Sequence, residues 1–453
     1  MTFRKPRLSF WQIINMKVGF FGIQYSFGLQ QTAINPLYTF LHAKPEDLPF
    51  LNLAGPMTGL LIQPLIGAMS DRTWHPRWGR RKPYFLVGAI FCSLCLFAFP
   101  FSKSLWMAAG LLWILDAANN TAMEPYRAFI ADKLPDSQRP MGFLTQSFFT
   151  GLGITLANLS LGFFQSIPSL QKVTTTSNGE SGIPYWVFGS FFVGAVCSIS
   201  SVLWSVTKTP EIPPTAEELA LLRAKKKGVI ETFREIFSAI SDMPKIMWQL
   251  ALVYFFQWYA MFCYWQFVSL SIAKSIFHTD SESNKDLYQQ AVVWAGKVNG
   301  FYNIVTFLSA FGLVYMAKKI GAKYVHIVCL LMAGTALLIF PHITDKTLLF
   351  FPMIGFGIAW ASMMGVPYIM VVGSIPKERY GVYMGIINMM IVIPMILQTL
   401  TFGFVYSHFL GNNPNNAISF AGVLLLLACF ATMLIKVTKT NLDEEIIPIG
   451  GGH

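Results

Sequence analysis

Twelve long apolar stretches run through this sequence and restrict it to folds that a lipid bilayer allows. Each is about 18 residues or longer, enough for an α-helix to cross a hydrocarbon core of roughly 30 Å. Charged residues make up only 12% of the 453 residues, about half the usual share in soluble domains. We therefore predict an all-α membrane protein with twelve transmembrane helices, near residues 10–41, 47–70, 83–102, 105–132, 140–167, 185–207, 246–277, 290–316, 323–341, 346–375, 381–409 and 416–437.

The basic residues are distributed unevenly between the two sides of such a bundle. Of the 33 Lys and Arg residues, 24 fall in the two termini and alternate connections, whereas the opposite connections contain only five. Because basic residues concentrate on the cytoplasmic side, we expect both termini to be cytoplasmic in a multi-pass protein of the cytoplasmic (inner) membrane. The net charge of +11 is then a signal of orientation, and no nucleic-acid partner is expected.

The longest connection divides the apolar stretches six and six. It is rich in charge, and its segment TAEELALLRAKKKG has the Thr and Glu spacing that begins a short surface helix. We expect five parts in chain order: a cytoplasmic N-terminus at 1–9, an N-terminal six-helix bundle at 10–207, a cytoplasmic linker at 208–245, a C-terminal six-helix bundle at 246–437 and a cytoplasmic tail at 438–453.

The two halves repeat a common plan. The segment PYRAFIADKLPDSQRPMGF (125–143) is echoed by PYIMVVGSIPKERYGVYMG (367–385). Each has a Pro-Tyr pair within an apolar stretch, then a second Pro, an Arg and a Gly at the start of the next stretch. Such duplication is typical of transporters built from parallel repeats around a site at mid-membrane. We therefore expect two pseudo-symmetric bundles in one monomer.

Five polar side chains gather in the fourth stretch: Asp116, Asn119, Asn120, Glu124 and Arg127. At about 100° per residue, the other four fall within about 80° of Asp116. A charge buried in hydrocarbon costs at least ~2.5–3.5 kcal/mol, so it needs a partner or water. Glu124 and Arg127 are three residues apart and can pair, which leaves open a purely structural role for them. Where the first half has the ionisable residues Asp116, Glu124 and Arg127, the second half has Ile358, Val366 and Ile369.

Asp116 has no charged neighbour within one helical turn. Burial favours the neutral form of a carboxyl group, the condition for an acid that takes up and releases protons. Asp116 is therefore the strongest candidate for a proton-coupling residue, and Glu124 and Arg127 are further candidates.

Other polar and aromatic residues within the stretches are consistent with a sugar site. Amides both donate to and accept from hydroxyl groups, and aromatic faces can cover the apolar side of a pyranose. The alternative for each aromatic is an interfacial anchor, and Lys17 is expected to extend toward the headgroups. The candidate substrate-binding residues are Gln24, Gln63, Asn119, Asn120, Gln257, Trp258, Trp265, Asn299, Asn303, Trp360 and Asn388.

The connection SDRTWHPRWGRRKP (70–83) concentrates charge at the end of the second stretch. We expect its arginines, together with an acid, to latch the two halves on the cytoplasmic side, although an orientation signal alone is the alternative. The candidate gate residues are Asp71, Arg72, Arg80 and Arg81.

Enzymatic chemistry finds little support in the sequence. It contains no nucleotide-binding Gly-rich loop followed by Lys-Ser/Thr and no plausible hydrolytic triad. All six cysteines fall within apolar stretches, where they are expected to pack. We predict a transporter with no cofactor and no metal site.

Several motifs resemble the major facilitator superfamily. The connection with GAMSDR and GRRKP is similar to the family's signature loop, widened here by TWHPRW. This form resembles the branch of plant sucrose–proton symporters and their bacterial and animal relatives, near the glycoside–pentoside–hexuronide symporters. The same branch is indicated by three segments: AGPMTGLLIQPLIGAMSDR (54–72), LDAANNTAMEPYRAFIADKLP (115–135) and GVPYIMVVGSIPKERYGVYMGIINMMIVIPMI (365–396).

The resemblance implies a proton-coupled disaccharide importer that works by alternating access, with twelve helices in two bundles. It assigns proton coupling to Asp116 and carries the paired amides onto Asn119 and Asn120 and the following arginine onto Arg127. Glu124 departs from the plant pattern, which has a small residue before the Pro, so a second acid is present.

Three questions stay open at the level of sequence. The sugar is a sucrose-, maltose- or trehalose-type disaccharide or another glucoside. The coupling ion is expected to be the proton, with sodium as the alternative. A sensor or scaffold without transport is the alternative from another functional class.

Overall fold

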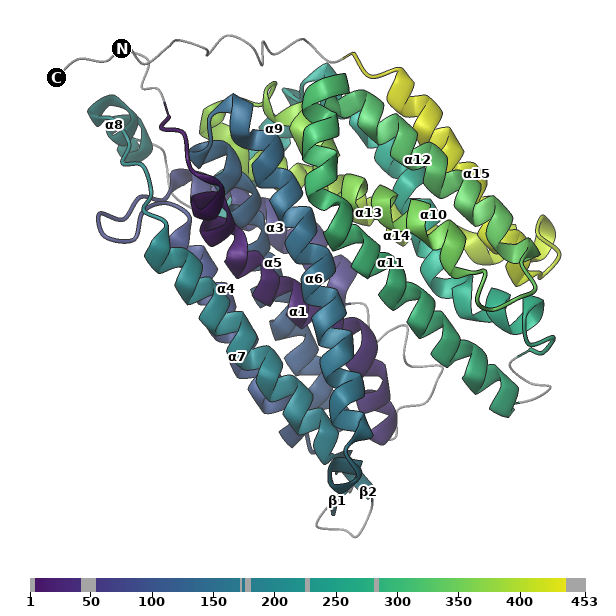
Figure 1. Cartoon of the computed structure of the whole chain (residues 1–453). Coiled ribbons are helices and arrows are strands. Elements are labelled where there is room, and N and C mark those ends of the chain that lie inside the picture. Colours follow the sequence, from purple (N-terminus) through teal and green to yellow (C-terminus); the bar gives the residue numbers. More distant parts are fainter. Residues whose placement is uncertain are drawn as a thin grey trace.

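The computed structural model describes residues 5–41, 54–171, 173–175, 181–224, 229–280 and 285–436. They form a helical bundle with two halves side by side (Figure 1), and the predicted all-α class with two six-helix bundles is confirmed. The first half contains α1 (Phe10–Phe40), α3 (Ala54–Arg72), α4 (Lys82–Ala98), α5 (Leu105–Lys133), α6 (Arg139–Ser166) and α7 (Tyr185–Lys208). The second half contains α10 (Lys245–Ser275), α11 (Lys285–Ile320), α12 (Ala322–Ile339), α13 (Phe350–Val372), α14 (Tyr380–His408) and α15 (Pro414–Met433).

The two halves pack their helices in the same pattern. In the first half α1 contacts α6 and α7, α4 contacts α5 and α7, and α3 contacts α5. Each of these pairs has its counterpart in the second half, where α10 contacts α14 and α15, α12 contacts α13 and α15, and α11 contacts α13. Both α5 and α13 contain the Pro of the repeated Pro-Tyr pair, Pro125 and Pro367. The internal repeat of the sequence is therefore a repeat of structure.

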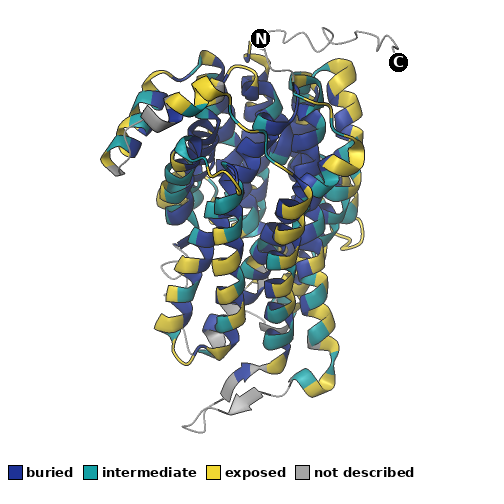
Figure 2. Ribbon diagram, turned by 90° about the vertical axis from the view of Figure 1, so that its left-hand side faces the viewer, coloured by how far each residue is buried: buried dark blue, intermediate teal, exposed yellow. Residues whose placement is uncertain are grey.

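The outer surface of the bundle suits a lipid environment. Among the described residues, nine helices are long and apolar enough to cross a membrane, and α5, which carries the charged cluster, is not among them. Exposed residues line the outside of the bundle and buried residues fill its interior (Figure 2). Several exposed side chains are large and apolar, such as Trp106, Phe351 and Leu400, each at least 75% exposed.

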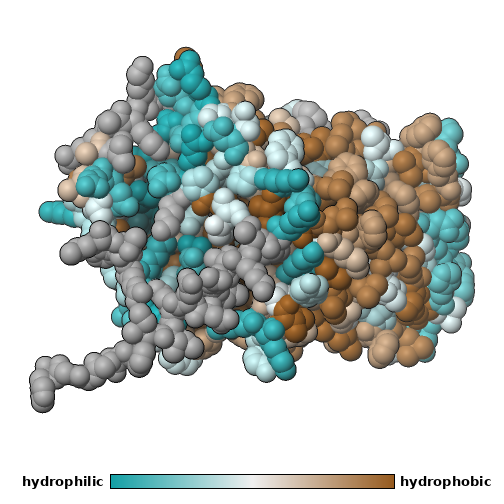
Figure 3. Space-filling model, turned by 90° about the horizontal axis from the view of Figure 1, so that it is seen from above, coloured by the Kyte–Doolittle hydropathy of each residue, from teal (hydrophilic) through white to brown (hydrophobic). Residues whose placement is uncertain are grey.

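The linker contains two helices at one end of the bundle, called here the linker end. The first, α8 (Ala216–Ala224), begins as predicted, because the Thr215 and Glu218 side chains accept hydrogen bonds from each other's backbone N–H groups. The second, α9 (Val229–Ser241), was not predicted, although its apolar residues recur at helical spacing. Seen from this end, hydrophilic residues gather over the first half and hydrophobic residues over much of the second (Figure 3).

The end opposite the linker carries a short hairpin between α6 and α7. Strand β1 (Val173–Thr175) pairs antiparallel with β2 (Ser181–Pro184). Several sequence expectations lie outside the described residues: the start of the stretch at 47–70, residues 1–4 and the tail at 438–453.

The contacts between the halves gather toward the linker end. Helix α3 packs against α14, and α6 packs against α11. Because α3 corresponds to α11 and α6 to α14, each of these two pairs is the counterpart of the other. At the linker end Gly67 and Gly381 bring the backbones of α3 and α14 together, and a Cβ on Gly67 would lie only 2.2 Å from the Gly381 oxygen. The contacts reach about midway along the helices, where Gly151 of α6 lies against Phe307 of α11. Toward the opposite end α11 diverges from α6 (Figure 1).

This close approach predicts the effect of a single methyl group. Gly67→Ala cannot be accommodated without moving α14, and overpacking of this kind costs about 1–3 kcal/mol. We expect the linker ends of the halves to separate, which electron spin resonance measures as a longer distance between nitroxides on Trp78→Cys and Tyr324→Cys. Both positions are exposed, and the native cysteines are buried or half-buried.

Gly110→Ala is the matched control, because nothing lies within 4 Å of a Cβ placed there. The control keeps the original distance distribution. An unchanged distribution in Gly67→Ala as well would contradict the tight packing of α3 on α14.

Candidate functional site

Asp116 lies near the middle of α5 and is fully buried. Its Oδ1 accepts a hydrogen bond of 2.6 Å from Nε2 of Gln30 on α1. Its Oδ2 has no hydrogen-bond partner among the described residues and lies beside Gly55 of α3. No ion pair found in the described part of the chain includes Asp116. The acid that is isolated in the sequence is therefore also isolated from the described basic side chains in space.

Glu124 and Arg127 begin a continuous chain of hydrogen bonds. They form the ion pair that their spacing predicts, with 3.3 Å between Oε2 and Nη1. The same Nη1 donates to Oε1 of Gln63 on α3 at 3.1 Å. Gln63 donates through Nε2 to Oδ1 of Asn120, whose Nδ2 donates to the backbone oxygen of Asp116 at 2.9 Å. This buried chain links the ion pair to the helix segment that carries the lone acid.

The ion pair also faces the second half. The Arg127 guanidinium lies over the ring of Tyr368 on α13, 5.2 Å from its centroid. On α10, the Tyr254 hydroxyl and both polar atoms of the Gln257 amide are buried without a partner among the described residues. The same is true of Oε1 of Glu124. Because buried polar groups are normally hydrogen-bonded, this zone between the halves can bind a polar ligand or water.

Three tryptophans of the second half form one cluster. Trp258 and Trp265 belong to α10 and Trp360 to α13, and the Trp360 ring centroid lies 5.8 Å from that of Trp258 and 5.6 Å from that of Trp265. Trp265 donates to the Tyr302 hydroxyl at 3.4 Å, whereas Nε1 of both Trp258 and Trp360 has no partner among the described residues. Trp258 and Trp360 are buried, so they are not lipid-facing anchors. The cluster combines apolar faces with free indole donors.

The predicted amides of α11 and α14 have different surroundings. On α11, Asn299 accepts a hydrogen bond of 2.8 Å from the Tyr264 hydroxyl. One turn later, Asn303 leaves its Oδ1 without a partner among the described residues. Asn388 of α14 donates to the backbone oxygen of Gly59 on α3 at 2.9 Å. The α11 amides are therefore near other polar groups of the second half, while Asn388 joins the two halves.

Two other predicted amides, Asn119 and Gln24, have neighbours within the first half. Asn119 donates to the Ser26 hydroxyl on α1 at 2.9 Å, whereas its neighbour Asn120 belongs to the chain that begins at Glu124. Gln24 of α1 is buried and lies against Gly153 of α6. Adjacent residues of the sequence thus face different helices.

Lys17 was expected to extend toward the headgroups, and this expectation is wrong. Its side chain is fully buried, and Nζ donates to the backbone oxygen of Tyr126 and to Oε1 of Gln146, both at 3.1 Å. The Tyr126 ring lies 5.3 Å away. Helices α5 and α6 therefore surround this cation with carbonyl, amide and aromatic groups, which the apolar pattern of α1 does not indicate.

The predicted gate residues lie at the linker end. Oδ1 and Oδ2 of Asp71, at the end of α3, accept hydrogen bonds of 2.9 and 3.0 Å from the backbone N–H groups of Gly381 and Val382 in the first turn of α14. A carboxylate is stabilised at a helix N-terminus. The Arg81 guanidinium donates to the same Oδ1 at 2.6 Å and to Asp132 at 2.7 Å. Asp71 therefore contacts the second half, and the Arg81 guanidinium, which also lies beside Gly381, pairs with it.

The other two arginines contact the linker. Arg72 donates through Nε to Glu235 of α9 at 2.6 Å. The backbone N–H groups of Arg80 and Arg81 both donate at 2.8 Å to the carboxylate of Glu211. Arg72 and the backbone of Arg80 thus order the linker and the loop around Asp71, whereas the Arg81 guanidinium lies beside Gly381 of the second half.

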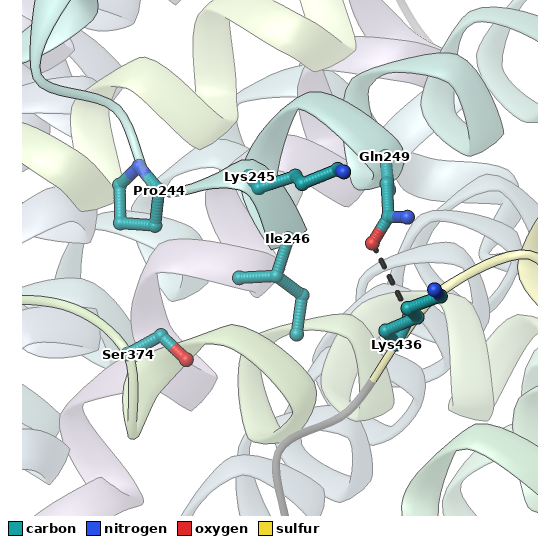
Figure 4. Close-up of a pocket in the computed structure, with 6 residues that line it drawn as sticks. All are labelled: Pro244, Lys245, Ile246, Gln249, Ser374 and Lys436. Atoms are coloured by element: carbon teal, nitrogen blue, oxygen red, sulfur yellow. Dashed lines mark hydrogen bonds between the residues drawn. The ribbon is translucent and has the colours of Figure 1, made fainter.

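A separate hollow of about 190 Å³ opens at the linker end of the second half (Figure 4). Gln249 accepts a hydrogen bond of 3.2 Å from the backbone N–H of Lys436 at its edge. The hollow shares no residue with the polar chain or the tryptophan cluster, so we do not assign it to the substrate. Its lining residues are Pro244, Lys245, Ile246, Gln249, Ser374 and Lys436.

Comparisons with known proteins agree on one family. The profile of the Major Facilitator Superfamily matches residues 18–399. The sucrose transport protein SUT5 of Oryza sativa subsp. indica is 23% identical over 488 residues, which cover 95% of this chain and 88% of that protein. The sucrose transport protein SUC4 of Arabidopsis thaliana is 25% identical over 465 residues, with 92% of this chain and 89% of that protein covered.

Solved structures share the fold at low identity. The proton:xylose symporter XylE, bound to 6-bromo-6-deoxy-D-glucose, superposes with a TM-score of 0.63 at 14% identity and covers 93% of this chain and 94% of its own. The transporter FucP in the outward conformation has a TM-score of 0.63 at 14% identity and covers 95% of this chain and 99% of its own.

The buried position of Arg81 predicts a large effect of its removal. Arg81→Met leaves Asp71 and the partly exposed Asp132 without the guanidinium that pairs with both. Breaking a buried ion pair from one side costs about 3–5 kcal/mol. We expect a clearly lower apparent Tm in detergent.

Arg77→Met, an exposed position in the same connection, is the control and should change stability by about 0.5 kcal/mol or less. Equal melting temperatures for the two variants would refute the structural role of Arg81.

Proposed function

The chain belongs to the Major Facilitator Superfamily, and on this basis we propose that it is a proton-coupled symporter for a disaccharide or another glucoside. Two observations on relatives support the sugar: the rice and Arabidopsis proteins are sucrose transport proteins and match nearly the whole chain. A sucrose- or maltose-type sugar is the proposed substrate class.

The proposal of proton coupling rests on Asp116. This residue is fully buried, the one described hydrogen bond of its side chain comes from the neutral amide of Gln30, and its Oδ2 has no partner among the described residues. Glu124, by contrast, has Arg127 as a partner. An unpaired carboxyl group gains most from binding a proton, because protonation removes a buried charge. Glu124 and Arg127 then act as a second, paired polar centre close to the interface between the halves.

The sugar site is proposed between the polar chain of the first half and the tryptophan cluster of the second. Gln63, Asn120 and Gln257 offer amides for sugar hydroxyls, while Trp258 and Trp360 offer aromatic faces with free indole donors. Helices of both halves contribute, so a bound sugar favours the state in which the halves close around it. Proton and sugar are coupled if both favour that same state.

The linker end is proposed to face the cytoplasm. The distribution of basic residues supports this orientation and a place in the cytoplasmic membrane, with the linker at 208–245 and both termini on the same side. In this structure the halves are joined at the linker end through Asp71 and α14. Alternating access then requires this contact to break when the sugar is released inward, while the opposite end closes.

Sodium coupling is the second candidate. A sodium site needs several oxygen ligands, and Asp116 with Glu124 supplies the acids nearest the proposed path. The described residues contain no cluster of three or more His, Cys, Asp or Glu side chains. Sugar accumulation that follows a sodium gradient and is insensitive to a proton ionophore would select this candidate. Absence of any sugar flux in liposomes would select a sensor or scaffold.

The proposal predicts a specific defect in Asp116→Asn. The amide keeps the size of the side chain but cannot change charge, so uphill uptake driven by a pH gradient should be lost. Exchange of labelled for unlabelled sugar, which needs no net proton movement, should persist. Both are measured in proteoliposomes made with the same protein, and normal proton-driven accumulation by Asp116→Asn would rule out the assignment.

The tryptophan cluster predicts a change in affinity without a loss of coupling. Trp360→Leu removes one aromatic face and one free donor, and we expect the KM for the sugar to rise by about tenfold, equivalent to roughly 1.4 kcal/mol. Trp106→Leu, at a position that is 75% exposed on the outer surface, should leave KM unchanged. Identical KM values in the two variants would remove the cluster from the substrate site.

A further inference from the structure

The linker helix α9 (Val229–Ser241) carries one wide apolar surface, of which one side faces the protein and the other faces outward. Its inner face packs against α3 and α14 and includes Ile236 and Ala239, both buried. Its outer face exposes Ile230, Phe233 and Phe237, which are 76%, 44% and 69% exposed. The inner face packs on the protein, whereas the outer face is exposed.

The helical positions show that the outer face is one continuous stripe. At about 100° per residue, Ile230, Phe233 and Phe237 fall within about 60° of one another. The polar residues Glu231, Arg234 and Ser238 lie on a different side, and the Arg234 side chain is 74% exposed. A surface helix in water directs one apolar stripe to the protein and keeps the rest polar. Here the apolar part continues past the protein contact.

The surroundings of α9 indicate that the stripe faces lipid. The helix lies against α3 and α14 (Figure 1). Near the same end of α3, Met69 lies one turn before Arg72, which binds α9, and is 40% exposed. Shortly after α9, Trp248 in the first turn of α10 is 55% exposed, and tryptophan is enriched at the membrane–water interface. The stripe therefore adjoins the lipid-facing surface of the bundle, where it starts at the linker end.

The rest of α9 and the residue after it bind both halves of the protein. Arg72 of the first half donates to Glu235 and, at 3.0 Å, to the backbone oxygen of Glu231. Arg379 of the second half donates to Asp242 at 3.1 Å. These contacts form one bridge over the closed linker end, next to the Asp71 contact.

We propose that α9 is an interfacial helix whose outer face docks on the lipid bilayer, with Ile230, Phe233 and Phe237 inserted at the boundary of headgroups and acyl chains. The occupant is the leaflet at the linker end. Apolar side chains anchor such helices, while their polar face stays in water. Only the identity of this leaflet as the cytoplasmic one rests on the proposed function.

Docking has a consequence for the gate. Arg72 and Arg379 belong to different halves, so both contacts with the α9 segment can form only while the linker ends are close together. When that end opens, α9 loses one of them. A lipid-anchored α9 therefore stabilises the closed linker end, and lipid becomes a factor in the conformational equilibrium.

Nitroxide accessibility in lipid bilayers tests the docking itself. A label on Phe237→Cys should be more accessible to oxygen, which concentrates in the acyl region, than to a water-soluble nickel chelate. A label on Arg234→Cys of the same helix should show the reverse. The native cysteines are buried or half-buried and react poorly. A Phe237→Cys label that favours the nickel chelate, or one shielded from both reagents as by a second copy or another protein, would overturn the proposal.

A second measurement tests the link to the gate. Leu144 is fully buried at the contact of α6 with α13, so a cysteine there reports opening of the linker end by its rate of maleimide labelling. The double substitution Ile230→Ser with Phe237→Ser should raise that rate several-fold in bilayers, and Arg234→Ser should not. Equal rates would refute the stabilising role. Neither experiment involves sugar or protons, so either can fail while the transport proposal holds.

Discussion

A charge buried among membrane helices needs a partner, water or a proton, and this requirement organises the polar interior of the protein. Arg81 lies between two acids at the linker end, and Arg127 pairs with Glu124 in the middle of the bundle. Asp116 alone has only an amide donor among the described residues. Lys17 has carbonyl and amide partners instead of an acid. Among the described acids that are buried, only Asp116 has no basic partner, and it is the residue to which we assign the movement of protons.

The pseudo-symmetry of the fold contrasts with the asymmetry of its chemistry. The two halves repeat the same helix contacts, and α5 and α13 each have an internal Pro-Tyr pair. Yet Asp116, Glu124 and Arg127 of α5 correspond to apolar positions of α13, which instead carries Tyr368 beside Arg127 and Trp360 in the tryptophan cluster. One half thus carries the charge and the other carries aromatic surface. This division is the reason why we propose the sugar site between them, since a sugar has both hydroxyl groups and apolar faces.

The sequence predicted the parts of this architecture that depend on local pattern. Apolar length gave the helices, and the spacing of Glu124 and Arg127 gave their ion pair. The isolation of Asp116 was also visible, because no charge follows within one turn. The Thr215 capping pattern located α8. Each of these features is determined by neighbours in the chain.

Features that depend on tertiary packing could not be predicted in the same way. Lys17 finds its partners on α5 and α6, which are remote in sequence. Asp71 accepts hydrogen bonds from backbone groups 310 and 311 residues away. Because every residue except Pro has a backbone N–H group, the residue types do not show which of these groups will donate. The apolar residues of α9 have helical spacing in the sequence, but which of them pack on α3 and α14 and which stay exposed depends on the tertiary structure.

Difference infrared spectroscopy of the purified protein tests the central claim most directly, because it observes a carboxyl group as it gains a proton. Addition of sugar near neutral pH should produce the C=O band of a protonated carboxylic acid, and that band should be missing from the Asp116→Asn protein. If the Asp116 side chain stays ionised with and without sugar, the account of coupling through a lone buried acid is contradicted.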